Sequence, residues 1–189
     1  MIMSRTQKGF TLIELLITIV IIAIVVAIAA PSFTTMILNQ RSEGVSEELV
    51  GALQLAKTEA VKRGGRVSLC AANPAGDDCA GDWTNGWLVI VDSAADDGAA
   101  APVLNSQDDI IRVFDAPDDR SVITATNNGA VSFVRYTSTG QLARIGGRAN
   151  VTTVVFDSYI DGCVGDRRRS ITVGVAGMMD VDRTACPGA

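Results

Sequence analysis

The chain has 189 residues, of which 48% are hydrophobic and 5% aromatic, and it carries 16 Lys and Arg against 21 Asp and Glu, a formal net charge of -5. This acidic balance argues against a generally basic surface that coats nucleic acid. Because the chain has no histidine, catalytic triads with a histidine base and histidine-ligated zinc or iron sites are excluded.

A long apolar segment begins at Phe10 and contains one charged residue as far as Ala30. A helix of this length extends about 31 Å, close to the ~30 Å hydrocarbon thickness of a bilayer. We therefore expect a membrane-spanning helix over residues 10–31, with a cleaved secretory signal as the alternative. Arg5 and Lys8 precede it, so the positive-inside tendency places the N-terminus in the cytoplasm and the rest of the chain outside.

Four cysteines, Cys70, Cys79, Cys163 and Cys186, fall in the part expected outside the cytoplasm, where disulfides persist. Their spacing favours pairing Cys70 with Cys79 and Cys163 with Cys186, although four cysteines allow three connectivities. A zinc site built from all four thiolates is the alternative, but the chain has no Cys-x-x-Cys pair. We expect disulfides, and neither a metal nor a cofactor.

Glu14 lies inside the apolar segment, where a carboxylate costs about 2.5 to 3.5 kcal/mol on insertion scales. The string Gly9-Phe10-Thr11-Leu12-Ile13-Glu14, which follows a short basic leader, resembles the class III signal of type IV prepilins and pseudopilins. This resemblance implies a leader peptide over residues 1–9, cleavage after Gly9 by a prepilin peptidase, and methylation of the new N-terminus at Phe10. It also implies that Glu14 pairs with the N-terminal amine of a neighbouring subunit during assembly.

Residues 32–64 are expected to continue the helix as an amphipathic half, because apolar side chains recur at three- and four-residue steps from Val45 to Ala60. Gly64-Gly65 predicts the end of the helix. Residues 65–189 predict a β-rich head with antiparallel pairing, so the fold class is α+β. Between turn signals, strands are expected at residues 66–70, 86–92, 110–114, 130–136, 152–156 and 170–175.

Two further stretches resemble the GspH/FimT-type minor pilins and pseudopilins. They are residues 49–64 with the following Val67-Ser68-Leu69-Cys70, and Trp83-Thr84-Asn85-Gly86-Trp87. The resemblance implies the type IV pilin-like fold, in which a long N-terminal helix packs on the head. The Cys70–Cys79 loop before the tryptophans looks more like the pilus branch, FimT and FimU, than the secretion branch. The tryptophans themselves are expected to pack in a hairpin rather than bind a ligand.

By resemblance, these motifs imply a structural minor pilin that takes part in type IV pilus assembly or initiation. A minor pseudopilin of a type II secretion system, similar to GspH, is one alternative. The implied partners are other minor pilins, the major pilin, the prepilin peptidase, the inner-membrane assembly platform and membrane lipid. The expected location is the bacterial inner membrane, as a single-pass protein with its head in the periplasm, and then the pilus filament.

A second alternative is a DNA-binding minor pilin that serves natural transformation. FimT-type DNA receptors resemble each other in a Gly-Arg-x-Arg stretch, but the corresponding place here, Gly177-Met178-Met179-Asp180, has neither arginine. The triplet Arg167-Arg168-Arg169, together with Arg148, would have to supply the phosphate contacts. Nucleic acid is a disfavoured partner, because the chain is acidic and Asp161 and Asp166 flank the triplet.

An enzyme is not expected. The paired carboxylates Asp96-Asp97, Asp108-Asp109 and Asp118-Asp119 lie among Gly, Ala, Pro and Ser, which predicts solvated loops. Neither a phosphate-binding glycine motif nor calcium-loop spacing accompanies them. A catalytic site needs convergent groups rather than isolated charges, so no residue is assigned a catalytic role.

Overall fold

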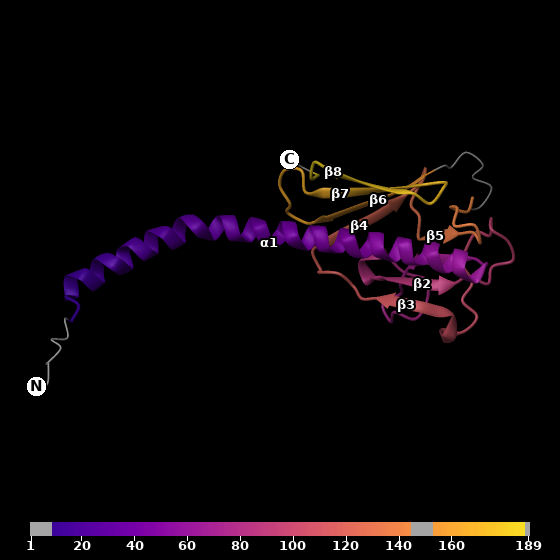
Figure 1. Ribbon diagram of the computed structural model, residues 1–189, viewed down its shortest axis with the longest axis horizontal. Helices are drawn as coiled ribbons and strands as arrows, with labels where there is room; N and C mark the ends of the chain where they lie inside the picture. Colours follow the sequence, from indigo (N-terminus) through magenta and orange to yellow (C-terminus); the bar gives the residue numbers. More distant parts are fainter. Residues whose placement is uncertain (1–8, 145–152, 188–189) are drawn as a thin grey trace, which may run out of the picture. The chain divides into compact units, whose positions relative to one another are not determined.

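The computed structural model describes residues 9–144 and 153–187 (Figure 1). The chain divides into two compact units, Met1–Asn39 and Gln40–Ala189. One helix, α1 (Leu12–Arg63), begins in the first unit and ends in the second. No helix in the described residues is long and apolar enough to cross a membrane. Residues 1–8 of the expected leader lie outside the described residues, and the segment boundaries expected from the sequence stay predictions.

The end of α1 is the glycine cap that the sequence predicts. The Gly64 amide donates to the Val61 carbonyl and the Gly65 amide to the Ala60 carbonyl, each over 3.2 Å. Gly64 has a φ of 61°, a left-handed conformation that glycine adopts without steric cost. This pair of bonds is the Schellman motif, which satisfies carbonyls at a helix end and turns the chain toward the first strand.

The described residues of the second unit form two antiparallel sheets of four strands each. In the first sheet the order is β3 (Ile110–Phe114), β2 (Trp87–Val91), β1 (Val67–Ala71), β5 (Phe133–Tyr136). In the second it is β4 (Ser121–Thr126), β6 (Thr153–Ile160), β7 (Arg168–Gly174), β8 (Met179–Thr184). Two short 3-10 helices, η1 (Trp83–Asn85) and η2 (Gln107–Asp109), precede β2 and β3.

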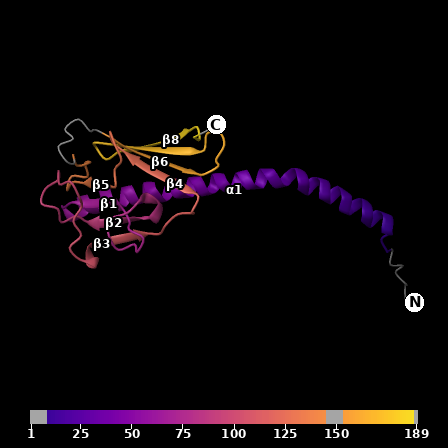
Figure 2. The same ribbon diagram turned by 180° about the vertical axis from the view of Figure 1, so that it is seen from behind.

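The last turns of α1 supply the buried stripe that joins the two sheets. Figures 1 and 2 show the sheet that ends in β8 on one side of this part of α1 and strands β2 and β3 on the other. The helix residues recur at three- and four-residue steps, as expected of an amphipathic helix. One buried cluster contains Leu49, Leu53, Ala56, Val89, Val134, Phe156 and Ile171.

Both tryptophans are packing residues. Trp83 is buried and its ring meets Phe156 edge-on, with the ring centroids 5.1 Å apart. Its indole Nε1 donates to the Val131 carbonyl over 2.8 Å, which satisfies the polar end of the ring. Trp87 is buried against Phe114, with the centroids 5.9 Å apart. The tryptophan motif therefore fixes the start of β2 in the core.

The α+β fold class and the antiparallel pairing are confirmed, and all six expected strands are present. The prediction missed β4 and β8. In β8, Asp180 and Asp182 surround the exposed Val181, so the strand lacks the buried apolar alternation by which strands are identified. Strand β4 alternates correctly, but three of its six residues are Ser or Thr, which weakens its apolar pattern.

Candidate assembly and binding sites

Thr11 and Glu14 form a capping box at the start of α1. The Glu14 amide donates to Thr11 Oγ1 over 3.3 Å, and the Thr11 amide donates to Glu14 Oε2 over 3.4 Å. Both bonds are long, but together they occupy amides that have no partner inside the helix. The Thr-x-x-Glu spacing in the sequence predicts this capping role. The resemblance to prepilins assigned Glu14 to assembly alone, so the cap was not predicted.

The first unit exposes large apolar side chains along its length. Phe10 at the expected mature N-terminus is 84% exposed, and among the described side chains Ile28, Phe33 and Ile37 are exposed as well. Exposed apolar surface of this extent is uncommon on a soluble monomer and marks a surface that lipid or other protein covers. Gly9, at the expected cleavage site, is also exposed, so it is accessible to a peptidase.

Two disulfides join the pairs that the spacing favours. Cys70 is bonded to Cys79 and Cys163 to Cys186, with Cα atoms 5.4 and 5.9 Å apart. The first closes the loop after β1. The second ties the residues after β8 to the turn after β6, where the Cys186 amide also donates to the Gly165 carbonyl over 2.9 Å. The C-terminal part of the described chain is therefore fixed to the second sheet.

Replacing Cys163 and Cys186 together with Ala is expected to lower the free energy of unfolding by about 3 kcal/mol. The removed crosslink closes a loop with a sequence separation of 23, and the unfolded chain gains that entropy. Urea denaturation of the native chain and of the variant in detergent, without a reductant because a reductant would also cleave Cys70–Cys79, measures the effect. An unchanged unfolding midpoint of the variant would contradict the role of the disulfide.

The arginine triplet does not form one basic patch. Successive residues of a strand point to opposite faces, so Arg168 and Arg169 separate. Arg168 bonds Asp157 on β6 through two contacts, of 2.5 and 3.0 Å, and these hydrogen bonds raise the pKa of the guanidinium. Arg169 is buried and paired with Glu43 of α1. Arg167 contributes its carbonyl, which accepts from Ser42 Oγ over 2.9 Å.

The turn at Gly177, another place considered for DNA, offers little to a phosphate. Arg148 lies outside the described residues. Gly177 to Asp180 form the turn into β8 and its first residues, where Lys57 Nζ donates to the Gly177 carbonyl over 3.0 Å. A Cβ on Gly177 would lie 2.4 Å from the Gly140 carbonyl oxygen, so only glycine fits. The Lys57 ammonium is thus already hydrogen-bonded to the turn.

Replacing Arg167 and Arg168 with Ala is expected to leave retention of double-stranded DNA unchanged. Arg168 already has a carboxylate partner, and the acidic chain repels phosphate. The measurement is a gel-shift titration with the full chain at low salt, where phosphate contacts contribute most. Salt-sensitive retention that the double variant abolishes would contradict this expectation and favour the DNA-binding alternative.

A buried ion pair joins Asp92, the residue after β2, to Arg135 of β5, and the sequence did not predict it. Arg135 Nε donates to Asp92 Oδ2 over 2.7 Å, and both side chains are 0% exposed. Asp92 also accepts from Ser68 Oγ over 2.5 Å, and from the amides of Ala94 and Val103 over 2.9 and 3.0 Å. Both charges are therefore extensively bonded, as buried charges must be.

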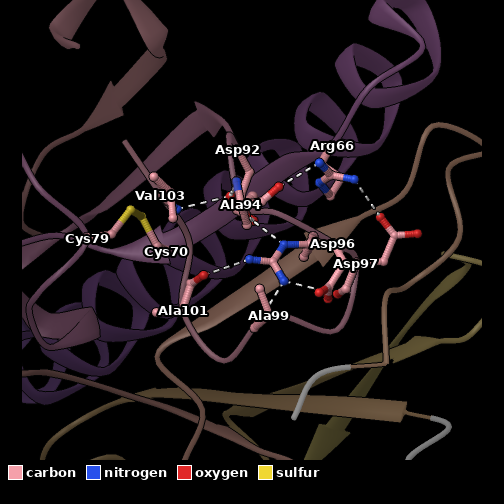
Figure 3. Close-up of polar contacts among 12 residues, drawn as sticks. Arg66, Cys70, Cys79, Asp92, Ala94, Asp96, Asp97, Ala99, Ala101 and Val103 are labelled. Carbon is pink, nitrogen blue, oxygen red and sulfur yellow. Dashed lines mark hydrogen bonds and ion pairs between the residues drawn. A yellow bond between two sulfur atoms is a disulfide. The ribbon is translucent and has the colours of Figure 1, made fainter. Parts of the chain in front are cut away.

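The same pair holds the loop that follows β2 (Figure 3). Arg135 donates to the carbonyls of Asp97, Ala99 and Ala101 over 2.8 to 3.0 Å. At the loop's edge, Arg66 Nη1 bonds Asp97 Oδ1 over 3.2 Å. The sequence predicts a solvated loop here, and the outer side chains of the loop are exposed. Its backbone carbonyls, however, accept hydrogen bonds from the buried Arg135 guanidinium.

The paired carboxylates occupy local structural positions. Asp109 caps η2 together with Ser106, and Asp118 Oδ2 pairs with Arg41 Nη1 at 2.5 Å. Asp96 Oδ1 accepts from the Gly98 amide over 2.8 Å. Across residues 9–144 and 153–187, no three His, Cys, Asp or Glu residues come together as a metal site.

Comparisons with known proteins show which families and proteins this chain is similar to. Residues 45–177 match the family model described as type II transport protein GspH, and residues 4–30 match the prokaryotic N-terminal methylation motif. The chain is 31% identical over 163 residues to the type IV major fimbrial protein FimA of Dichelobacter nodosus, covering 85% of this chain and 98% of that protein.

Two crystal structures of the type IV minor pilin FimU from Pseudomonas aeruginosa share the fold. One has a TM-score of 0.56 at 21% identity and covers 78% of this chain and 94% of the FimU chain. The other has a TM-score of 0.50 at 24% identity and covers 77% and 97%. Similarity at this level of identity establishes the arrangement of helix and sheets.

Proposed function

Because the chain belongs to the GspH family and carries the prepilin-type methylation motif, we propose that it is a minor pilin, a structural subunit that takes part in type IV pilus assembly. The observation that carries this proposal is the combination of the two matches in one chain, a prepilin signal followed by a pilin-like head. The FimA relative supports the pilus over the secretion system, and the fold shared with FimU supports the pilin-like head.

In this proposal, the Glu14 carboxylate exchanges its hydrogen-bond partner during assembly. Cleavage after Gly9 frees the amine of Phe10, which becomes a methylated ammonium. In apolar surroundings an ammonium and a carboxylate each lose hydration, and they recover that free energy only when they meet. Glu14 would leave its long bonds to Thr11 and pair with the Phe10 amine of a neighbouring subunit. The exposed apolar side chains would then pack between subunits in the filament core.

The prepilin signal indicates membrane anchoring before the subunit enters a pilus. We place the unassembled protein in the bacterial inner membrane as a single-pass protein, with its disulfide-bonded head in the periplasm. The oxidising compartment suits both disulfides. Its proposed partners are other minor pilins and the major pilin, with the prepilin peptidase, the assembly platform and membrane lipid acting before assembly. As a structural subunit it needs no catalytic residue.

Deletion of the gene in the native host tests this function against its two alternatives. Surface pili, uptake of labelled DNA and the secreted proteins are scored in parallel, with the gene restored as the control. Loss of pili together with uptake supports a filament-building minor pilin. Intact pili with lost uptake would favour a DNA receptor, and intact pili with lost secretion would favour a pseudopilin.

A further inference from the structure

The turn after β4 contains an Asn-Gly pair at its tip. Asn128 and Gly129 are both exposed, and the Val131 amide donates to the Ala125 carbonyl over 2.9 Å to close the turn below them. Asn128 has a φ of 50°, a left-handed conformation that asparagine tolerates better than most residues. Tight turns between paired strands favour Asn-Gly for this reason. The turn also brings together two groups that can react with each other.

The reacting groups are the Asn128 carboxamide and the Gly129 backbone nitrogen. Attack of this nitrogen on Asn128 Cγ forms a C–N bond and closes a succinimide ring, while the carboxamide nitrogen leaves as ammonia with the proton from the Gly129 amide. Water then opens the ring at either carbonyl, which gives aspartate or isoaspartate. No group is oxidised or reduced, and water is the co-reactant. A following glycine has no Cβ to obstruct the attack.

The surroundings of Gly129 leave this attack unobstructed. Its amide has no hydrogen-bond partner among residues 9–144 and 153–187, so no bond has to break before the nitrogen turns toward Asn128 Cγ. A Cβ built on Gly129 would have nothing within 4 Å, so the peptide between the two residues has room to rotate. The Asn127 amide donates to the Gly129 carbonyl over 2.9 Å, which occupies the carbonyl and leaves the nitrogen free.

The other Asn-Gly pair in the chain, Asn85 and Gly86, is packed into the head. The Gly86 amide donates to the Trp83 carbonyl over 3.3 Å at the end of η1. Gly86 is buried, and a Cβ there would lie 2.3 Å from the Phe114 carbonyl oxygen. Rotation of this peptide therefore requires local opening of the packed start of β2, and such opening is rarely populated in a stable core. The two pairs share a sequence and differ in their surroundings.

We propose that Asn128 is a site of spontaneous deamidation in the folded chain, and that packing protects Asn85 from the same reaction. Gly129 lines a groove of about 450 Å³ together with Asp82 and Trp83. The reaction places a new carboxylate beside that groove, and the isoaspartate product also adds a methylene group to the main chain of the turn. The proposal is independent of the proposed function, since it needs no partner.

The test follows the full chain in detergent during incubation at mildly alkaline pH. Digestion with an acid-active protease, which avoids further reaction during preparation, and mass spectrometry with fragmentation locate each deamidated residue. A sample digested at once gives the starting level. We expect Asn128 to gain the mass that distinguishes a carboxylate from a carboxamide at least about 10-fold faster than Asn85, because Asn85 must first be released by local opening.

The chain unfolded in guanidinium chloride is the matched control, because unfolding removes the packing from Asn85 and gives both pairs similar surroundings. Both residues should then react at similar rates. Asn128→Gln should lose the fast product in the folded chain, since the longer side chain cannot close the same ring. Equal rates at Asn85 and Asn128 in the folded chain would overturn the proposal. A folded chain in which Asn128 stays unmodified, while the unfolded chain reacts there, would overturn it as well.

Discussion

Replacing Asp92 with Ala is expected to lower the free energy of unfolding by about 3 to 5 kcal/mol, because the change leaves a buried charge without its partner. Arg135 would keep its three carbonyl bonds but lose the carboxylate, and Ser68 Oγ would lose its acceptor. The loop after β2 would lose two amide contacts as well. Urea denaturation of the full chain in detergent, followed by tryptophan fluorescence, measures the change.

Asp97→Ala is the matched control, because it removes an ion pair from the same loop at the surface. The Arg66 and Asp97 side chains are 30% and 52% exposed, and exposed pairs contribute about 0 to 1 kcal/mol. Equal effects of the two substitutions would mean that the buried pair does not hold the loop and the strands together.

The same ion pair makes stability depend on pH at acidic values. Burial raises the pKa of Asp92, but hydrogen bonds from Arg135, Ser68 and two amides outweigh it, so the pKa lies below its ordinary value of 3.8. A lowered folded-state pKa adds stability above the unfolded pKa, and this stability is lost as the pH falls through the folded value. The native chain and Asp92→Ala should therefore differ less in their free energy of unfolding below about pH 4 than at neutral pH.

Glu14→Gln is expected to abolish incorporation into pili while membrane association persists. Glutamine at this position still suits the capping box, so the substitution removes the charge and spares the helix start. If the missing ion pair costs about 3 kcal/mol, incorporation falls by about 100-fold. Immunoblots of sheared pili and of membranes from the same cells, normalised to the major pilin, measure both quantities.

Thr11→Ala is the control for the helix cap. It removes the hydroxyl that accepts from the Glu14 amide, which typically costs about 1 kcal/mol, and it leaves the carboxylate in place. Near-normal incorporation of Thr11→Ala is expected. If Glu14→Gln assembled normally and Thr11→Ala did not, the function of Glu14 would be the cap within one subunit and the proposed pairing between subunits would be wrong.

Local sequence patterns predicted the structural elements that depend on residues close together in the chain. The helix end at Gly64-Gly65 and the strand at residues 110–114 follow from turn residues and apolar spacing. The short string from Gly9 to Glu14 carried the assignment of a prepilin signal, which the match to the methylation motif supports. The cysteine pairs followed from compartment and spacing, because each joins residues close in the chain.

Interactions between distant residues could not be predicted in this way. Asp92 and Arg135 are 43 residues apart, and Glu43 and Arg169 are 126 apart. Each residue alone has the sequence pattern of an ordinary surface charge, and only the pairing of β1 with β5 and the packing of α1 bring the partners together. The basic triplet shows the same difficulty, since strand alternation places Arg168 and Arg169 beside different carboxylates.

The most direct test of the central claim is mass spectrometry of the N-terminal peptide of this chain in pili sheared from the native host. A subunit that is processed and assembled as proposed gives a peptide that begins with N-methylated Phe10 and retains Glu14. Absence of the chain from purified pili, together with a membrane-bound form that still begins before Gly9, would contradict the assignment as a minor pilin.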